Sequence, residues 1–117
     1  MNSVIGRIYA GYPINKLPDR DIWQYVIEYE NSYGKLSKMF VSQKGSYPED
    51  THHPIRFRFD LVIEAIPKQN PSEFGPRHFT NVYVTNAVPL YSIEEIEYES
   101  GLLNQESHEI HISKIGE

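Results

Sequence analysis

The sequence predicts an all-β protein in which five strands close into a small barrel, followed by an acidic C-terminal extension. Two observations carry this prediction. Apolar and polar residues alternate with a period of two over several segments separated by turn-forming residues, and the acidic residues gather near the C-terminus. With 117 residues, of which 39% are hydrophobic, the chain is long enough to bury one core. We therefore expect one barrel domain over residues 1–91 and a separate acidic segment over residues 92–117.

The alternation is clearest over residues 55–66, where apolar residues occupy the odd positions and mainly charged residues the even ones. Such a pattern is typical of a strand with one buried and one exposed face. The same reasoning predicts strands over 4–10, 22–30, 35–42 and 77–88. Residues 30–34 form a good hairpin turn, and 43–54 and 67–76 are expected to be loops. A closed barrel accounts for these elements because closure removes exposed strand edges.

The charge distribution separates the last quarter of the chain from the rest. Residues 1–91 carry ten Lys or Arg and nine Asp or Glu, a net charge of +1, whereas residues 92–117 carry one Lys and seven Glu, a net charge of −6. Ser92 and Glu95 have the spacing of a helix capping box. Ile110 and Ile112 alternate with polar residues as in a short strand. Both structures remain open for this segment, and a solvated extension that only aids solubility remains a third possibility.

Several functional classes lack sequence support. The chain has no Cys and none of the motifs typical of phosphate-binding loops, serine hydrolases or zinc proteases, so we expect no enzyme and no cofactor. The adjacent His52 and His53, and the pair His108 and His111, provide too few ligands for a metal site. No leader or membrane-spanning segment is apparent. We expect a soluble, cytoplasmic protein, in the host cytoplasm if it is viral.

Aromatic and basic residues interleave along the predicted strands, which is the combination that single-stranded nucleic acid requires. Flat rings stack on bases, and cations follow the phosphates. Alternatively, the aromatic face of residues 22–30 belongs to the core or to a subunit interface, and the face carrying the arginines is simply solvated. Asp60 is the next residue on that face and a candidate partner for Arg58. The candidate binding residues are Trp23, Tyr25, Tyr29, Lys35, Lys38, Arg56, Arg58, Phe74 and Arg77.

Two segments resemble the OB-fold single-stranded DNA-binding proteins, particularly their short bacteriophage members. These are the opening NSVIGRI and the long FDLVIEAIPKQNPSEFGPRHFTNVYVTNAVPL, within a resemblance that covers residues 2–91. It implies an OB-type barrel that binds single-stranded DNA independently of sequence during phage or mobile-element replication and recombination. It also implies a homo-oligomer, with replication or recombination proteins as possible partners of the acidic tail. The chain departs from the family in lacking a helical pattern over 43–54 and in ending Ile115-Gly116-Glu117.

A second hypothesis is a small phage protein-interaction or inhibitor module that uses its acidic surface, which the overall net charge of −5 favours. For the DNA-binding function we expect self-association, because one small barrel offers only a short binding track. Tyr9 and Val62, on the exposed faces of predicted strands, are the candidate interface residues.

Overall fold

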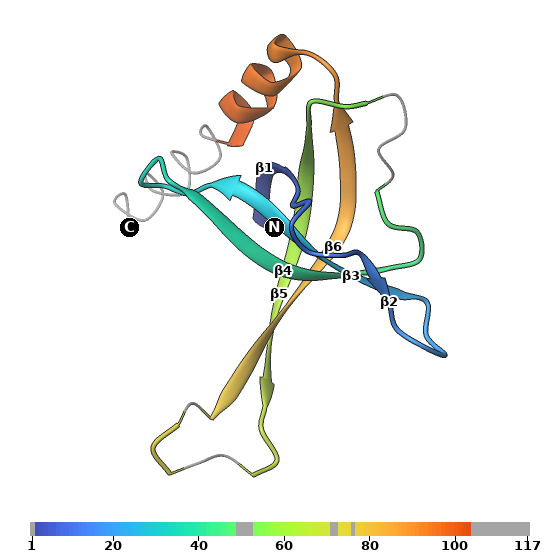
Figure 1. Cartoon of the computed structure of the whole chain (residues 1–117). Coiled ribbons are helices and arrows are strands. Elements are labelled where there is room, and N and C mark those ends of the chain that lie inside the picture. Colours follow the sequence, from blue (N-terminus) through green and yellow to red (C-terminus); the bar gives the residue numbers. More distant parts are fainter. Residues whose placement is uncertain (1, 49–52, 71–72, 76, 104–117) are drawn as a thin grey trace.

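The computed structural model describes residues 2–48, 53–70, 73–75 and 77–103 (Figure 1). In these ranges the chain is mostly β-sheet, with one helical segment at residues 93–103. The strands are β1 (Asn2–Ile8), β2 (Asn15–Lys16), β3 (Ile22–Glu30), β4 (Leu36–Lys44), β5 (Arg56–Pro67) and β6 (His78–Leu90).

The six strands form one sheet that closes into a ring. Their order is β1-β5-β6-β4-β3-β2, and β1 pairs with β3 as well as with β5. All pairs are antiparallel except β4–β6, which is parallel and short, with Ser42 opposite Tyr83 and Gln43 opposite Val84. At Gly6 the backbones of β1 and β3 approach so closely that a Cβ atom would collide with the carbonyl oxygen of Glu28. A glycine at this position therefore permits the β1–β3 pairing.

The all-β prediction is confirmed, but the number of strands is not, because the structure adds the two-residue β2 to the five predicted strands. Strand β3 has the predicted bounds, and the turn that follows contains Gly34 at φ 74°. The segment between β1 and β3 contains two prolines, which cannot donate a backbone hydrogen bond to a sheet. Its residues Asn15 and Lys16 nevertheless pair with Gln24 and Trp23. Residues 43 and 44 extend β4 rather than belonging to the predicted loop.

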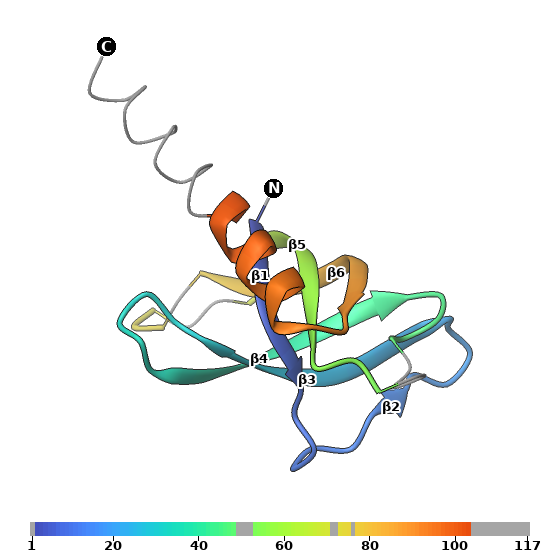
Figure 2. The same ribbon diagram turned by 90° about the horizontal axis from the view of Figure 1, so that it is seen from above.

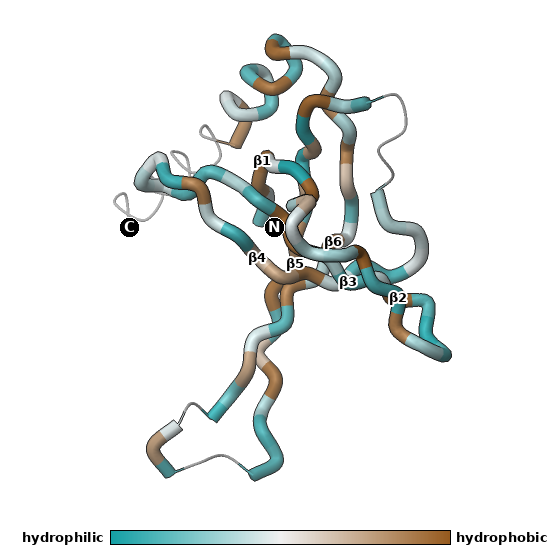
Figure 3. The backbone as a smooth tube through the Cα atoms, viewed as in Figure 1, coloured by the Kyte–Doolittle hydropathy of each residue, from teal (hydrophilic) through white to brown (hydrophobic). Residues whose placement is uncertain are grey.

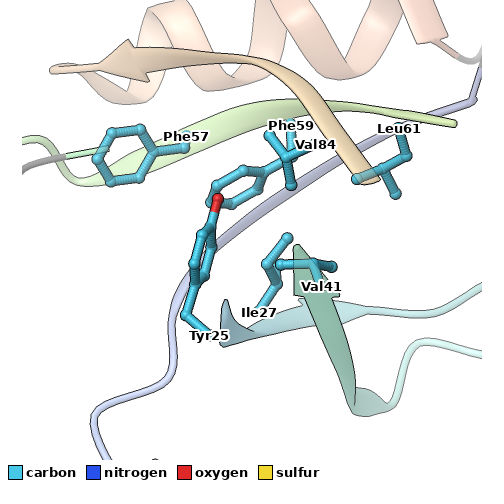
Figure 4. Close-up of a cluster of buried hydrophobic side chains, with 7 residues drawn as sticks. All are labelled: Tyr25, Ile27, Val41, Phe57, Phe59, Leu61 and Val84. Atoms are coloured by element: carbon cyan, nitrogen blue, oxygen red, sulfur yellow. The ribbon is translucent and has the colours of Figure 1, made fainter. Parts of the chain in front are cut away.

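The core lies inside the ring and contains side chains from β3, β4, β5 and β6. Figure 4 shows the Tyr25 ring beside the Phe59 ring, with Phe57 and the aliphatic residues around them. The ring centroids of Phe57 and Phe59 are 5.5 Å apart, and those of Tyr25 and Phe59 are 6.5 Å apart. Seven buried residues form this cluster: Tyr25, Ile27, Val41, Phe57, Phe59, Leu61 and Val84. The core is thus small and depends on large aromatic side chains.

The distal halves of β5 and β6 leave the ring as a two-stranded arm (Figure 1). The register shifts at Asp60/Leu61, where β6 has the extra residue Thr85, and the Thr85 hydroxyl donates a hydrogen bond to the Asp60 carbonyl (3.2 Å). A bulge of this kind bends a hairpin and increases its twist. In Figure 3 the hydrophobic positions concentrate where β4 and β5 cross, and the end of the arm is mostly hydrophilic.

The helical segment at residues 93–103 lies over the end of β1 and β5 (Figure 2). Its start matches the capping signal, since the Ser92 hydroxyl accepts a hydrogen bond from the Glu95 N–H (3.1 Å) and the Glu95 carboxylate accepts one from the Tyr91 N–H (2.7 Å). Of the two structures left open for the acidic segment, a helix is therefore confirmed at its N-terminal end. The possible strand around Ile110 and Ile112 lies outside the described residues.

Phe59 provides a test of the core, because its ring is fully buried whereas Phe74, on the arm, is 94% exposed. We expect Phe59→Ala to lower the free energy of unfolding by about 3–5 kcal/mol, as large core truncations do. The matched control Phe74→Ala should change it by less than about 0.5 kcal/mol. Urea unfolding followed by circular dichroism measures both, and equal losses would contradict the assignment of the core.

Candidate functional site

The surface with the most distinctive chemistry is the outer face of β3 and β4. Because side chains alternate along a strand, every second residue of this pair points away from the core. Cross-strand neighbours on this side are Glu28 with Lys38, Val26 with Phe40, and Gln24 with Ser42. Tyr9 and Tyr12, which follow β1, contact Lys38 and Phe40 on this side. We define the outer face as Arg7, Tyr9, Tyr12, Gln24, Val26, Glu28, Lys38, Phe40, Ser42 and Lys44.

Aromatic rings and cations meet on the outer face. The Lys38 ammonium lies 4.8 Å from the centre of the Tyr9 ring, a cation–π contact. The Phe40 ring is 48% exposed and meets the Tyr12 ring edge to face, with centroids 5.9 Å apart and an interplanar angle of 84°. This edge contact holds Phe40 on the surface and leaves part of its ring accessible. The face therefore presents a supported aromatic platform.

The charge of the outer face is predominantly positive. Arg7 Nε lies 3.5 Å from Glu28 Oε1, and the glutamate is the more buried of the two side chains. Glu28 is thereby partly neutralised, whereas Lys38 and Lys44 are exposed. An anionic ligand that lies along β4 would meet these two lysines on either side of Phe40.

Tyr25 was predicted to stack on a base, but in the structure it is a core residue. Its side chain is fully buried, and its hydroxyl donates a hydrogen bond to Gln43 Oε1 (2.5 Å). Burial raises the pKa of the Tyr25 phenol above its ordinary value. A ring in this position is inaccessible to a base, so Tyr25 is excluded from the candidate interface.

The other two aromatic residues predicted on this strand, Trp23 and Tyr29, are half-buried. Tyr29 packs against the core cluster. Trp23 lies nearer the sheet edge, where its ring centre is 4.5 Å from that of Tyr47 and 5.6 Å from the Lys16 ammonium. Among the described residues, Trp23 therefore combines a ring with a nearby cation.

Arg58 is engaged inside the protein. Its guanidinium donates hydrogen bonds to Asp60 (3.2 and 3.3 Å) and to Glu99 of the C-terminal helix (3.0 Å), and its side chain is 25% exposed. The hydrogen bond to Glu99 is the main cause that raises the Arg58 pKa. The expected pairing with Asp60 is present, and Ser3 also donates a hydrogen bond to Asp60 (2.7 Å). With two carboxylates on it, Arg58 is a structural ion-pair residue rather than a free cation.

The remaining predicted residues are distributed over the molecule. Arg56 is half-buried and donates a hydrogen bond to the carbonyl of Ile55 (2.8 Å). Lys35 is exposed beside the β3–β4 turn, and Phe74 and Arg77 are exposed at the end of the arm. Lys38 alone, among the nine predicted residues, belongs to the outer face.

Four residues of the outer face were not predicted as site residues, namely Phe40, Lys44, Tyr12 and Arg7. A signal for two of them was present, since Lys38, Phe40, Ser42 and Lys44 occupy alternate positions of one strand opposite the buried Val41. The contributions of Tyr12 and Arg7 depend on tertiary pairing, which spacing alone does not reveal. Tyr9, predicted as an interface residue, lies here against Lys38.

Among the described residues, no group of three or more His, Asp or Glu side chains is arranged to hold a metal ion. Nor does this part of the chain contain a helix long and apolar enough to cross a membrane. Comparisons with protein-family models, curated proteins and solved structures find no match to the chain.

The raised pKa of Tyr25 predicts a loss of stability at alkaline pH. In the unfolded chain the phenol ionises near pH 10, whereas in the folded protein it stays neutral to higher pH. The stabilisation is complete below pH 10 and falls by about 1.4 kcal/mol per pH unit above it. Urea unfolding between pH 8 and 11 should show that Tyr25→Phe lacks this component, whereas the exposed Tyr33→Phe control follows the wild type. Parallel pH curves for wild type and Tyr25→Phe would contradict the prediction.

Proposed function

We propose that the chain is a single-stranded DNA-binding protein built on an OB-type barrel, and that the outer face is its main interface. The order of the five ring strands supports the proposal. In OB-folds the second and third barrel strands, with the loop after the first strand and the loop between the last two, bind oligonucleotides. The second and third ring strands here are β3 and β4, and the corresponding loops are residues 9–21 and the end of the arm.

The observation that carries the proposal is the exposed Phe40 ring between Lys38 and Lys44 on one strand face. Aromatic stacking contributes about 1–3 kcal/mol per base and works with every base, because each base has a π-face. Lysines on either side of the ring would meet the flanking phosphates. This arrangement supports binding to unpaired strands, since bases within a duplex are already stacked on one another.

The end of the arm provides a second contact in this proposal. Phe74 is almost fully exposed, and Arg77 follows three residues later. A strand leaving the outer face along β6 would encounter this ring and cation. The biological setting would then be DNA replication or recombination in a phage or another mobile element, as the sequence resemblance implies.

We also propose that two copies of the protein associate through the arm. Val62, Ile63 and Phe79 are exposed apolar residues on a two-stranded ribbon, and isolated hairpins are only marginally stable in water. A second copy would cover them. Light scattering at micromolar protein concentration should report a dimer or larger assembly, which Val62→Glu should weaken. A monomeric mass for the wild type would contradict this part of the proposal.

A protein-interaction role for the acidic segment is a second candidate function. The helical residues include exposed Tyr98 and Leu102, which lie one turn apart, as well as exposed Glu94 and Glu97. Apolar and acidic side chains on one short helix suit a basic, partly apolar partner, such as a replication or recombination protein.

Stacking on Phe40 can be tested by fluorescence titration with oligo-dT. We expect Phe40→Ala to weaken binding about 5- to 150-fold, which corresponds to the loss of one stacked base. The matched control is Tyr33→Ala, because Tyr33 is 86% exposed in the β3–β4 turn and lies off the outer face. The wild type should bind the single strand more tightly than a duplex of the same length. Equal affinity for both forms, or no binding at low salt, would refute the proposed function.

The salt dependence of binding tests the two lysines. Each phosphate neutralised on a single strand contributes about −0.7 to the slope of log K against log salt. Replacing both Lys38 and Lys44 by Ala should therefore make the slope less negative by about 1.4. Lys35→Ala, beside the turn, is the control and should leave the slope unchanged. An unchanged slope in the double variant would place the phosphate contacts elsewhere.

A further inference from the structure

A hollow of about 220 Å³ adjoins the outer face where β4 pairs with β6. It lies between the loop at residues 17–20, the outer side of β3 and β4, and the part of β6 that enters the arm. The lining residues that matter here are Arg20, Gln24, Phe40, Ser42, Asn81 and Tyr83. The hollow is therefore continuous with the aromatic platform, because Phe40 belongs to both.

Carboxamide groups distinguish this hollow from the rest of the outer face. Gln24 and Asn81 each carry one donor group and one acceptor oxygen at the end of the side chain. Asn81 Nδ2 donates a hydrogen bond to Tyr83 Oη (3.3 Å), which restrains the amide and leaves Oδ1 as an acceptor. Within the described residues, Gln24 forms no side-chain hydrogen bond. Two half-exposed amides thus face a space that also has an aromatic wall.

The rim of the hollow is fixed by the backbone. The Leu17 N–H donates a hydrogen bond to the Ile22 carbonyl (3.0 Å), and the Arg20 N–H donates one to the Leu17 carbonyl (3.4 Å). These bonds hold the loop that carries the exposed Arg20 next to β3. A guanidinium at this rim is suitably placed for the phosphate of a nucleotide whose base enters the hollow.

We propose that the hollow takes one unpaired base and reads its edge through the amides of Gln24 and Asn81. Asn and Gln pair bidentately with adenine, whose N6 amino group and N7 present a donor beside an acceptor. Adenine is therefore the expected base, stacked against Phe40. This inference rests on the proposed function and adds to it, because stacking alone would make the protein indifferent to sequence.

The test compares short oligonucleotides of dT in which a single dA occupies each position in turn, titrated against the full chain. At one position dA should raise the affinity about 5-fold or more over all-dT, as one bidentate base contact does. Asn81→Ala, outside the outer face, should remove most of this preference while retaining affinity for all-dT. Gln24→Ala should remove the preference as well, measured as the ratio of dA to all-dT affinity because Gln24 belongs to the outer face. Gln69→Ala is the matched control, because Gln69 is an exposed amide on the arm outside the hollow.

Retained dT affinity also shows that the Asn81 variant is folded, and circular dichroism checks the folding of both variants. If all-dT binds and dA gives no advantage at any position, the hollow does not read a base, although the proposed function stands. A preference that persists in both amide variants, or a stronger preference for dG, would overturn the assignment to Gln24 and Asn81. Absence of binding to every oligonucleotide would refute the proposed function itself and this inference with it.

Discussion

Closure of the ring is the constraint on which the rest of the structure depends. Strand β1 pairs with β3 on one side and β5 on the other, and the parallel β4–β6 pair completes the circuit. Once the sheet is closed, each strand has one side toward the interior and one toward solvent. Tyr25 and Phe40 lie on adjacent strands, and closure places the first in the core and the second on the surface. The candidate interface is thus a direct consequence of the strand pairing.

The strands themselves were largely predictable because alternation and turn residues are local signals. Residues 22–30 illustrate this, since Asn31 and Gly34 end the strand and Asn31 accepts hydrogen bonds from two backbone N–H groups of the turn. Which side of each strand faces the core was harder to predict. On β3 both sides carry large apolar residues, with Tyr25 and Ile27 on one and Ile22 and Val26 on the other. The interior of a small closed sheet is filled best by large side chains, and the side of β3 that carries Tyr25 faces this interior.

Long-range pairing explains the remaining differences between the predicted and observed sites. Asp60 was the expected partner of Arg58 on its own strand, but Glu99, 41 residues later, also reaches Arg58 through the C-terminal helix. Lys38 lies over Tyr9, 29 residues earlier in the chain, and this contact depends on the way residue 9 follows β1 past β3. Neither partner can be identified from the spacing of charges along one strand. Of the nine binding residues predicted from the sequence, Lys38 lies on the outer face, and the others depend on pairings that local spacing does not reveal.

An ion pair with the barrel changes the role of one carboxylate of the acidic segment. Taken as a loose chain, a segment of net charge −6 would compete with DNA for the cations of the barrel. In the structure its helical part lies over β1 and β5, and Glu99 is bound to Arg58, so this carboxylate acts within the fold (Figure 2). Electrostatic effects on exposed groups decay over about 8–10 Å at physiological salt. The helix covers β1 and β5, whereas Phe40 and its flanking lysines lie on β4. The ion pair therefore stabilises the helix on the side of the ring where those strands pair.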